Sequence, residues 1–234
     1  MNYDLAVIKM MLKAARRDGL IQDDPGEFVN LVKRENAESR RPFTLGDIKA
    51  ILEVANGEWQ SLIKFGLYTG QRLSDLVLLS WANVDLERNE IRLVTSKTGK
   101  MMLIPIADPL RRHILSLPAS DDPKAPLHSR AYNCKISTLS NQFVDLLAAA
   151  GLRPRRQDKY PGRGSGKGRA GRRIHSGVSF HSLRHTAVTL LKDAGIPEAA
   201  VMELIGHDSK RMSALYTHVG REALEKAVAA LPEI

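Results

Sequence analysis

The amino-acid sequence predicts a mainly α-helical protein with a small antiparallel β-sheet, an α+β fold. Apolar residues recur at helical spacing along most of the 234 residues, and this spacing changes to alternation only around residues 90–106. The composition, 43% hydrophobic and 26% charged, is that of a globular protein with a buried core. A wholly disordered, collagen-like or coiled-coil chain is therefore excluded.

The chain is expected to hold two parts, residues 1–40 and 41–234. A first helix is predicted between Asn2 and Gly19, because apolar residues recur at helical spacing and a glycine suits the end of a helix. Residues 21–41 are rich in turn-forming and charged residues, which indicates a linker between the two parts.

The second part is predicted to open with three helices. Thr44 and Asp47 have the spacing of a capping box, which marks the start of a helix. A second apolar helix is expected to end near Gly70, and a third to begin at Leu73. Arg72 therefore lies at the break between two helices.

A β-hairpin is predicted where the periodicity changes. Apolar and polar residues alternate over 90–95, and residues 101–106 form a short apolar run. A glycine-bearing turn over residues 96–100 joins them. Lys97 and Lys100 are expected at the tip of this hairpin.

Helical signals return after the hairpin. We expect helices over residues 110–117, 139–151, 181–195, 197–206, 209–216 and 221–231. Within these, His181 and Arg184 are three residues apart and project from one helix face. Gly206 is expected to end its helix, with His207 just beyond the cap.

A strongly basic segment interrupts the helices. Residues 153–173 hold seven Arg and two Lys against one Asp, with many glycines and hardly any apolar residue. We interpret residues 153–176 as a flexible basic arm that neutralises DNA phosphates, the alternative being a solvated insertion with no ligand. The predicted DNA-binding residues are Lys100, Arg153, Arg155, Arg156, Arg163, Lys167, Arg169, Arg172 and Arg173.

The overall charge of the protein indicates which kind of molecule it binds. Thirty-five Lys and Arg against 26 Asp and Glu leave a formal charge of +9, which favours a polyanion. The sequence contains no run of about 18 apolar residues, so no membrane span is predicted. The N-terminus is unlike a signal peptide. A cytoplasmic location is therefore expected. Cys134, the single cysteine, cannot form an intrachain disulfide and is expected to be a buried apolar side chain.

Each candidate functional residue has an ordinary structural interpretation when it is taken alone. Arg72 could be a surface arginine, His207 could satisfy helix carbonyls, and Tyr216 could belong to the core. His181 and His185 have the spacing of half a metal site, but no acidic third ligand lies nearby. We therefore expect no bound metal.

Five short motifs in a fixed order are more specific than any of these residues alone. They are Thr69-Gly70-Gln71-Arg72, Ser96-Lys97-Thr98-Gly99, His181-Ser182-Leu183-Arg184-His185, Gly206-His207 and Tyr216-Thr217-His218. Over about residues 41–219 this order resembles the tyrosine recombinase family, to which phage integrases belong. The resemblance implies the catalytic-domain fold of that family and a site-specific recombinase that cleaves and rejoins DNA through a 3′-phosphotyrosine, without metal, ATP or another cofactor.

The resemblance also implies a role for each motif residue. Displacement at phosphorus adds negative charge to the nonbridging oxygens, and two arginines, Arg72 and Arg184, offer permanently charged paired donors for them. Tyr216 is then the nucleophile and Lys97 the acid that protonates the departing 5′ oxygen, with Lys100 as the runner-up. His181 is the candidate base, and His207 the donor to a nonbridging oxygen.

Further expectations concern domains and partners. By resemblance, the helix within residues 1–40 is the last helix of a truncated core-binding domain, and residues 221–234 form a C-terminal segment exchanged between neighbours. Family members act as homotetramers on paired double-stranded DNA sites, in bacteria or encoded by phages and mobile elements. Two alternatives stay open: a catalytically inactive DNA-binding remnant, and a type IB topoisomerase, which the Tyr-Thr-His motif disfavours.

Overall fold

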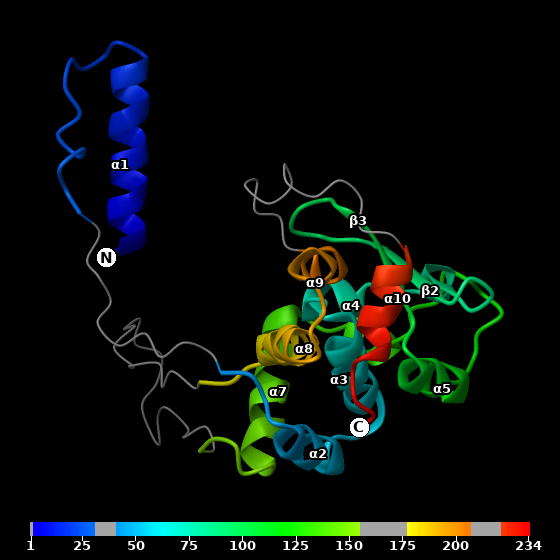
Figure 1. Ribbon diagram of the computed structural model, residues 1–234. Coiled ribbons are helices and arrows are strands. Elements are labelled where there is room, and N and C mark those ends of the chain that lie inside the picture. Colours follow the sequence, from blue (N-terminus) through cyan, green and yellow to red (C-terminus); the bar gives the residue numbers. More distant parts are fainter. Residues whose placement is uncertain (1, 31–40, 155–176, 207–220) are drawn as a thin grey trace. The chain divides into compact units, whose positions relative to one another are not determined.

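The computed structural model describes residues 2–30, 41–154, 177–206 and 221–234 (Figure 1). The chain divides into two compact units, Met1–Ser39 and Arg40–Ile234. In the first unit, helix α1 spans Asn2–Arg17. The chain beyond it folds back along the helix, because the Lys9 ammonium donates to the Val29 carbonyl at 2.5 Å and Arg16 pairs with Glu27 at 3.1 Å.

The second unit is mainly helical with one small sheet, which confirms the predicted fold class. Its elements in order are α2 (Leu45–Val54), α3 (Gly57–Thr69), α4 (Leu73–Val77), a 3₁₀ turn (Trp81–Asn83), β1 (Val84–Asp85), β2 (Glu90–Val94), β3 (Met101–Pro105), α5 (Asp108–Ser116), α6 (Ser129–Tyr132), α7 (Ile136–Ala149), α8 (His181–Asp193), α9 (Glu198–Ile205) and α10 (Arg221–Ala229). Among the described residues, no helix is long and apolar enough to cross a lipid bilayer.

The three strands form an antiparallel sheet in the order β1-β2-β3. The predicted hairpin is confirmed, with Ile91 opposite Ile104 and Leu93 opposite Met102. These four side chains are buried, so one face of the sheet packs on the core. Strand β1 was not predicted, because two residues are too few to show alternation.

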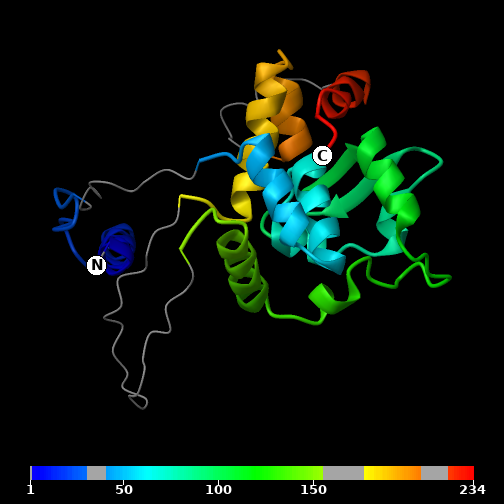
Figure 2. The same ribbon diagram turned by 90° about the horizontal axis from the view of Figure 1, so that it is seen from below.

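Helix α3 is central to the core of the second unit. It packs against α8 on one side and α5 on the other, as both ribbon views show (Figures 1 and 2). Phe65 is fully buried, and burial of such a side chain stabilises the fold by roughly 2 kcal/mol. At Gly66, an added Cβ would lie 2.9 Å from the Phe180 ring, so glycine permits the close approach of α3 to the start of α8.

The start of the second unit is fastened to α8. The backbone N–H of Arg41 donates to the Gly177 carbonyl at 2.8 Å, and that of Phe43 donates to the Thr186 hydroxyl at 2.7 Å. The predicted capping box follows directly, with the Thr44 hydroxyl and the Asp47 carboxylate each bonded to the other's backbone N–H.

The structure differs from the sequence predictions in two short helices and in the burial of the single cysteine. The short helix α6 was not predicted, and α4 is a five-residue turn of helix rather than a longer one. Cys134 is half-buried and packs on the edge of the core, so its predicted full burial is wrong. The predicted helix over 209–216 and most of the basic arm lie outside the described residues.

Candidate active site

The break between α3 and α4 places Arg72. Gly70 ends α3 in the left-handed conformation, with φ +62°, and a Cβ there would lie 2.1 Å from the Ile205 side chain. Only glycine therefore fits both the backbone and the space. The turn puts Arg72 at the residue just before α4, with about a quarter of its side chain exposed.

Arg184 lies on α8 and is 2% exposed, which is rare for an arginine. Its Nη1 donates to the Gly70 carbonyl at 2.9 Å, so it contacts the same turn that carries Arg72. Among the described residues, Nε and Nη2 of Arg184 have no hydrogen-bond partner. Buried donors without acceptors are costly, so the site is suited to an acceptor supplied by a ligand.

The charges around Arg184 favour an anion. The pKa of Arg184 is lowered to about 10, mainly by burial and also by the positive charge of Arg72, against an opposing effect of Asp75. The guanidinium is still protonated at neutral pH. Two buried or half-buried cations held near each other gain from an anion that neutralises them, and a phosphate diester fits paired N–H donors.

Asp75 connects the arginines to the hairpin, and sequence reasoning missed it. Its side chain is fully buried, with Oδ2 3.8 Å from Arg72 Nη1. Its Oδ1 accepts from the Ser96 backbone N–H at 2.9 Å and from the Ser96 hydroxyl. The signal in the sequence was an acidic residue three positions after Arg72 on a short helix. Its partner on the hairpin is 21 positions away and could not be read from that spacing.

Lys97 follows Ser96 at the exposed tip of the turn. Lys100, the runner-up acid, forms an ion pair with Glu203 of α9, with Nζ and Oε2 3.0 Å apart. The turn is therefore held at Ser96 by α4 and at Lys100 by α9. Between these two attachments Lys97 extends from a fixed base, as a proton donor to a bound ligand requires.

His181 is the first residue of α8, next to Phe180, whose ring packs edge-on against Phe143 with centroids 5.2 Å apart. The His181 and His185 rings also meet edge-on, 4.9 Å apart. This aromatic packing fixes the end of the helix that carries His181. Within the described residues, no group of three or more His, Cys, Asp or Glu is arranged to hold a metal ion.

Gln71 is a second residue that sequence reasoning missed as part of the site. It is buried, and its side-chain amide donates to the carbonyls of Leu204 and Ile205 at 3.3 and 3.5 Å. It thereby holds the end of α9, where Gly206 adopts φ +69°. Its sequence signal was only its place between Gly70 and Arg72.

The structure thus brings four of the predicted functional segments into contact. The turn with Arg72, the hairpin with Lys97, the helix with His181 and Arg184, and the helix before His207 are joined through Gly70, Asp75 and Gln71. Arg153 is half-buried beyond α7. The predicted residues that lie outside the described part of the chain are His207, Tyr216, Arg155, Arg156, Arg163, Lys167, Arg169, Arg172 and Arg173.

The sequence model of the phage integrase family matches residues 43–128 and 163–222, more than half of the chain. The tyrosine recombinase XerC of Pelotomaculum thermopropionicum is 29% identical over 208 residues, which cover 88% of this chain and 59% of that protein. The tyrosine recombinase XerD of Ralstonia nicotianae is 27% identical over 235 residues, covering 95% of this chain and 70% of that protein. The chain thus spans less than two thirds of the first of these relatives.

Solved structures show the same fold. The Tn1549 transposon integrase in complex with a circular intermediate DNA aligns with a TM-score of 0.66 and 18% identity, over 98% of this chain and 78% of that one. A lambda integrase dimer bound to a COC′ core site aligns with a TM-score of 0.63 and 20% identity, over 93% of this chain and 74% of that one. Because the family model matches more than half of the chain, including both arginine-bearing segments, the chain belongs to the phage integrase family, the tyrosine recombinases.

Proposed function

We propose that this chain is the catalytic part of a site-specific tyrosine recombinase, which cleaves and rejoins double-stranded DNA through a 3′-phosphotyrosine intermediate. The observation that carries the proposal is Arg184, a buried guanidinium with two donors unpartnered among the described residues and with Arg72 close enough to lower its pKa. Such a pair is preorganised for a phosphate diester and stabilises the charge that develops on it.

The reaction assigned to this site is a direct displacement at phosphorus. The Tyr216 phenol oxygen forms a bond to phosphorus as the bond to the 5′ oxygen breaks. The phenol proton passes to His181, and Lys97 protonates the departing oxygen. Arg72, Arg184 and His207 bind the nonbridging oxygens. Since the phosphotyrosine retains the diester's energy, the reverse attack by a 5′ hydroxyl rejoins the strand without ATP.

Asp75 is assigned a positioning role in this reaction. Its carboxylate lies beside Arg72 and accepts two hydrogen bonds from Ser96, the residue before Lys97. A rigid link between a cation of the clamp and the turn of the proton donor fixes their separation. Preorganisation of this kind lowers the barrier because no reorganisation is needed during the reaction.

The proposed partners follow from the relatives. A lambda integrase tetramer bound to a Holliday junction aligns with this chain at a TM-score of 0.62. We propose double-stranded DNA as the substrate, a homotetramer as the active assembly, and action in a bacterial cytoplasm. Helix α1 would then be the last helix of a core-binding domain, and residues 221–234 the segment exchanged between neighbours. The basic residues of 153–173 would contact phosphates.

The test is covalent capture on DNA. Full-length protein is incubated with a nicked suicide duplex drawn from the gene's flanking DNA, from which the cleaved fragment diffuses away. A denaturation-resistant protein–DNA adduct is expected, with or without excess EDTA. Tyr216→Phe is expected to bind the duplex with unchanged affinity and form no adduct, because only the nucleophilic oxygen is removed.

Other results would support other functions. Specific binding by the wild-type protein without an adduct would identify a DNA-binding remnant. Cleavage that disappears in EDTA and returns with magnesium would indicate a nuclease. An adduct formed by Tyr216→Phe would show that another residue is the nucleophile.

A further inference from the structure

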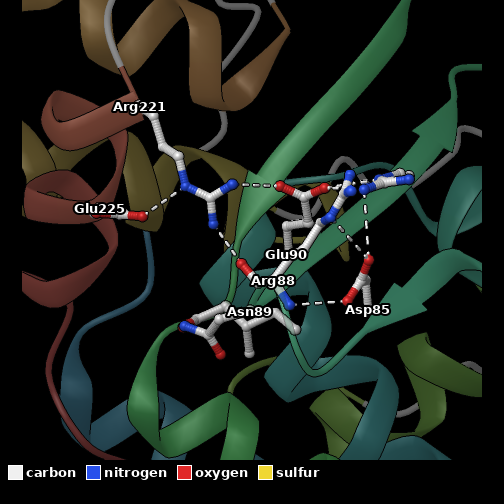
Figure 3. A network of polar contacts seen from close by, with 8 residues as sticks. Asp85, Arg88, Asn89, Glu90, Arg221 and Glu225 are labelled. Carbon is white, nitrogen blue, oxygen red and sulfur yellow. Dashed lines mark hydrogen bonds and ion pairs between the residues drawn. The ribbon is translucent and has the colours of Figure 1, made fainter.

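A second cluster of arginines and carboxylates lies at the end of the sheet where the middle strand β2 begins (Figure 3). At its centre is Glu90 of β2, whose side chain is only 8% exposed. One carboxylate oxygen accepts a hydrogen bond from Arg92 Nε at 2.7 Å and forms an ion pair with Arg92 Nη2 at 2.6 Å. The other oxygen accepts from Arg221 Nη1 at 2.8 Å. None of these residues belongs to the site described above.

Arg221 is held on three sides. Besides Glu90, its Nε pairs with Glu225 of the same helix at 2.8 Å, and its Nη2 donates to the Arg88 carbonyl in the turn between β1 and β2. Each of its nitrogens thus has an acceptor, and two of the three acceptors belong to the sheet. The first turn of α10 is thereby fixed to the sheet rather than only to its own helix.

Arg221 is close in the sequence to Tyr216, the proposed nucleophile. It lies five positions after Tyr216, and a chain of five steps spans at most about 18 Å. The upstream anchor, at Gly206, is ten residues from Tyr216, which allows about 36 Å. The downstream anchor therefore sets the tighter limit on how far Tyr216 can lie from a fixed point of the described structure.

We propose that Glu90 is a positioning residue for the nucleophile: through Arg221 it fixes the downstream end of the segment that carries Tyr216. When residues 221–234 are exchanged in the proposed tetramer, the Glu90 that binds Arg221 belongs to the neighbouring subunit. This inference rests on the proposed function. A shorter, fixed tether raises the effective concentration of the phenol at the clamped phosphate. Glu90 then acts on the rate of cleavage after DNA is bound and not on the affinity for DNA.

Helix α10 has further contacts that keep it packed when the contact between Glu90 and Arg221 is lost. Leu224, Ala227 and Val228 are buried, and the Tyr68 hydroxyl donates to the Pro232 carbonyl at 2.7 Å. Arg112 pairs with Glu233 at 2.5 Å. These contacts hold the rest of the helix and the end of the chain when the Glu90 contact is weakened, so the loss is confined to the first turn.

The experiment compares single-turnover adduct formation at saturating nicked duplex. Glu90→Gln, which keeps the shape and removes the charge, is expected to slow adduct formation about tenfold with unchanged DNA affinity. Arg221→Gln should match it, and Arg221→Lys should recover part of the rate because a cation again faces Glu90. Glu233→Gln, which breaks an exposed ion pair of the same terminal segment, is the control and should keep the wild-type rate.

A second measurement tests whether the effect passes through the tyrosine. In a Tyr216→Phe background, hydrogen peroxide is supplied as a free nucleophile that needs no tether, and strand cleavage is followed. Glu90→Gln should leave this rate unchanged, whereas Arg184→Lys should lower it. Equal adduct rates for wild type and Glu90→Gln, or a Glu90→Gln effect on peroxide cleavage, would overturn the inference. Absence of any wild-type adduct would overturn the proposed function and this role with it.

Discussion

Two buried carboxylates in this molecule each lie beside two arginines, and the two groups differ in one respect. Around Glu90, Arg92 and the three nitrogens of Arg221 have acceptors. Around Asp75, the described residues leave two donors of Arg184 without a partner, and Arg72 meets the carboxylate only at 3.8 Å. The first group is a completed network, and the second has spare donors.

The difference separates an anchor from a binding site. In a buried ion pair whose donors and acceptors are all hydrogen-bonded, these bonds offset the cost of desolvating the charges and fix the relative positions of the two side chains. A buried cation with spare donors is held in an unfavourable state, and the favourable partner comes with the ligand. The lowered pKa of Arg184 reflects that cost directly. The two groups should therefore respond oppositely to substitution.

The largest expected contrast is in cleavage rate. Arg184→Lys keeps a positive charge but loses the paired donors, so single-turnover adduct formation should fall by about 10²–10³-fold, as when a transition-state donor is removed. Arg221→Lys should remain within about tenfold of wild type, since it acts only through position. Similar losses for both lysine variants would show that the two groups do not differ in function.

A smaller contrast is expected in stability. Because the folded pKa of Arg184 is lowered well below the usual value of an arginine, to about 10, its charged form costs about 3 kcal/mol in the folded state. The arginine is protonated in both states below pH 10, so the cost is fully present at neutral pH. The cost is relieved as the pH rises above about 10, where the unfolded chain holds more protons than the folded chain.

Arg184→Met should therefore leave the free energy of unfolding unchanged or raise it, even though the Gly70 carbonyl loses its donor. Arg221→Met should lower it by about 1 kcal/mol, because Glu90 keeps only Arg92 and the arginine is half-exposed. Denaturant unfolding at pH 7 measures both. A strongly destabilised Arg184→Met would mean that Arg184 is an anchor like Arg221.

Sequence reasoning predicted what depends on local spacing. The capping box at Thr44, the alternation along β2 and the helix that begins at His181 each follow from residues a few positions apart. The fold class was predicted for the same reason, since most elements show their own period.

The connecting residues were not predicted, because their roles depend on distant partners. Gln71 binds carbonyls more than 130 positions away, and Asp75 binds a serine on the hairpin. Glu90 alternates with the buried Ile91 and Leu93 of β2, yet Arg221 covers it from the far end of the chain. Nothing near Glu90 in the sequence indicates that contact.

The smallest expected effect on cleavage concerns the basic residues of 153–173, which belong to neither carboxylate group. Replacing them with a short Gly-Ser linker should weaken binding to all duplexes alike. The slope of log affinity against log salt should flatten by about 0.9 for each phosphate that the protein no longer neutralises. The adduct rate at saturating DNA should stay near wild type, because α8 is held by Leu183, Ala187 and Leu191 in the core and by Thr186 against Phe43.

The replacement also tests the comparison between the two carboxylate groups. If the clamp alone supplies transition-state stabilisation, removal of nine cations elsewhere changes affinity without changing the saturated rate. The control substitutes Lys49 of α2 and Lys192 of α8 with Gln, which removes exposed charge from helix surfaces without altering any loop. An unchanged salt slope would make the basic segment an insertion that binds no phosphate. A saturated rate that falls as far as in Arg184→Lys would place part of the catalytic charge in that segment, and the buried arginine pair would then not be sufficient.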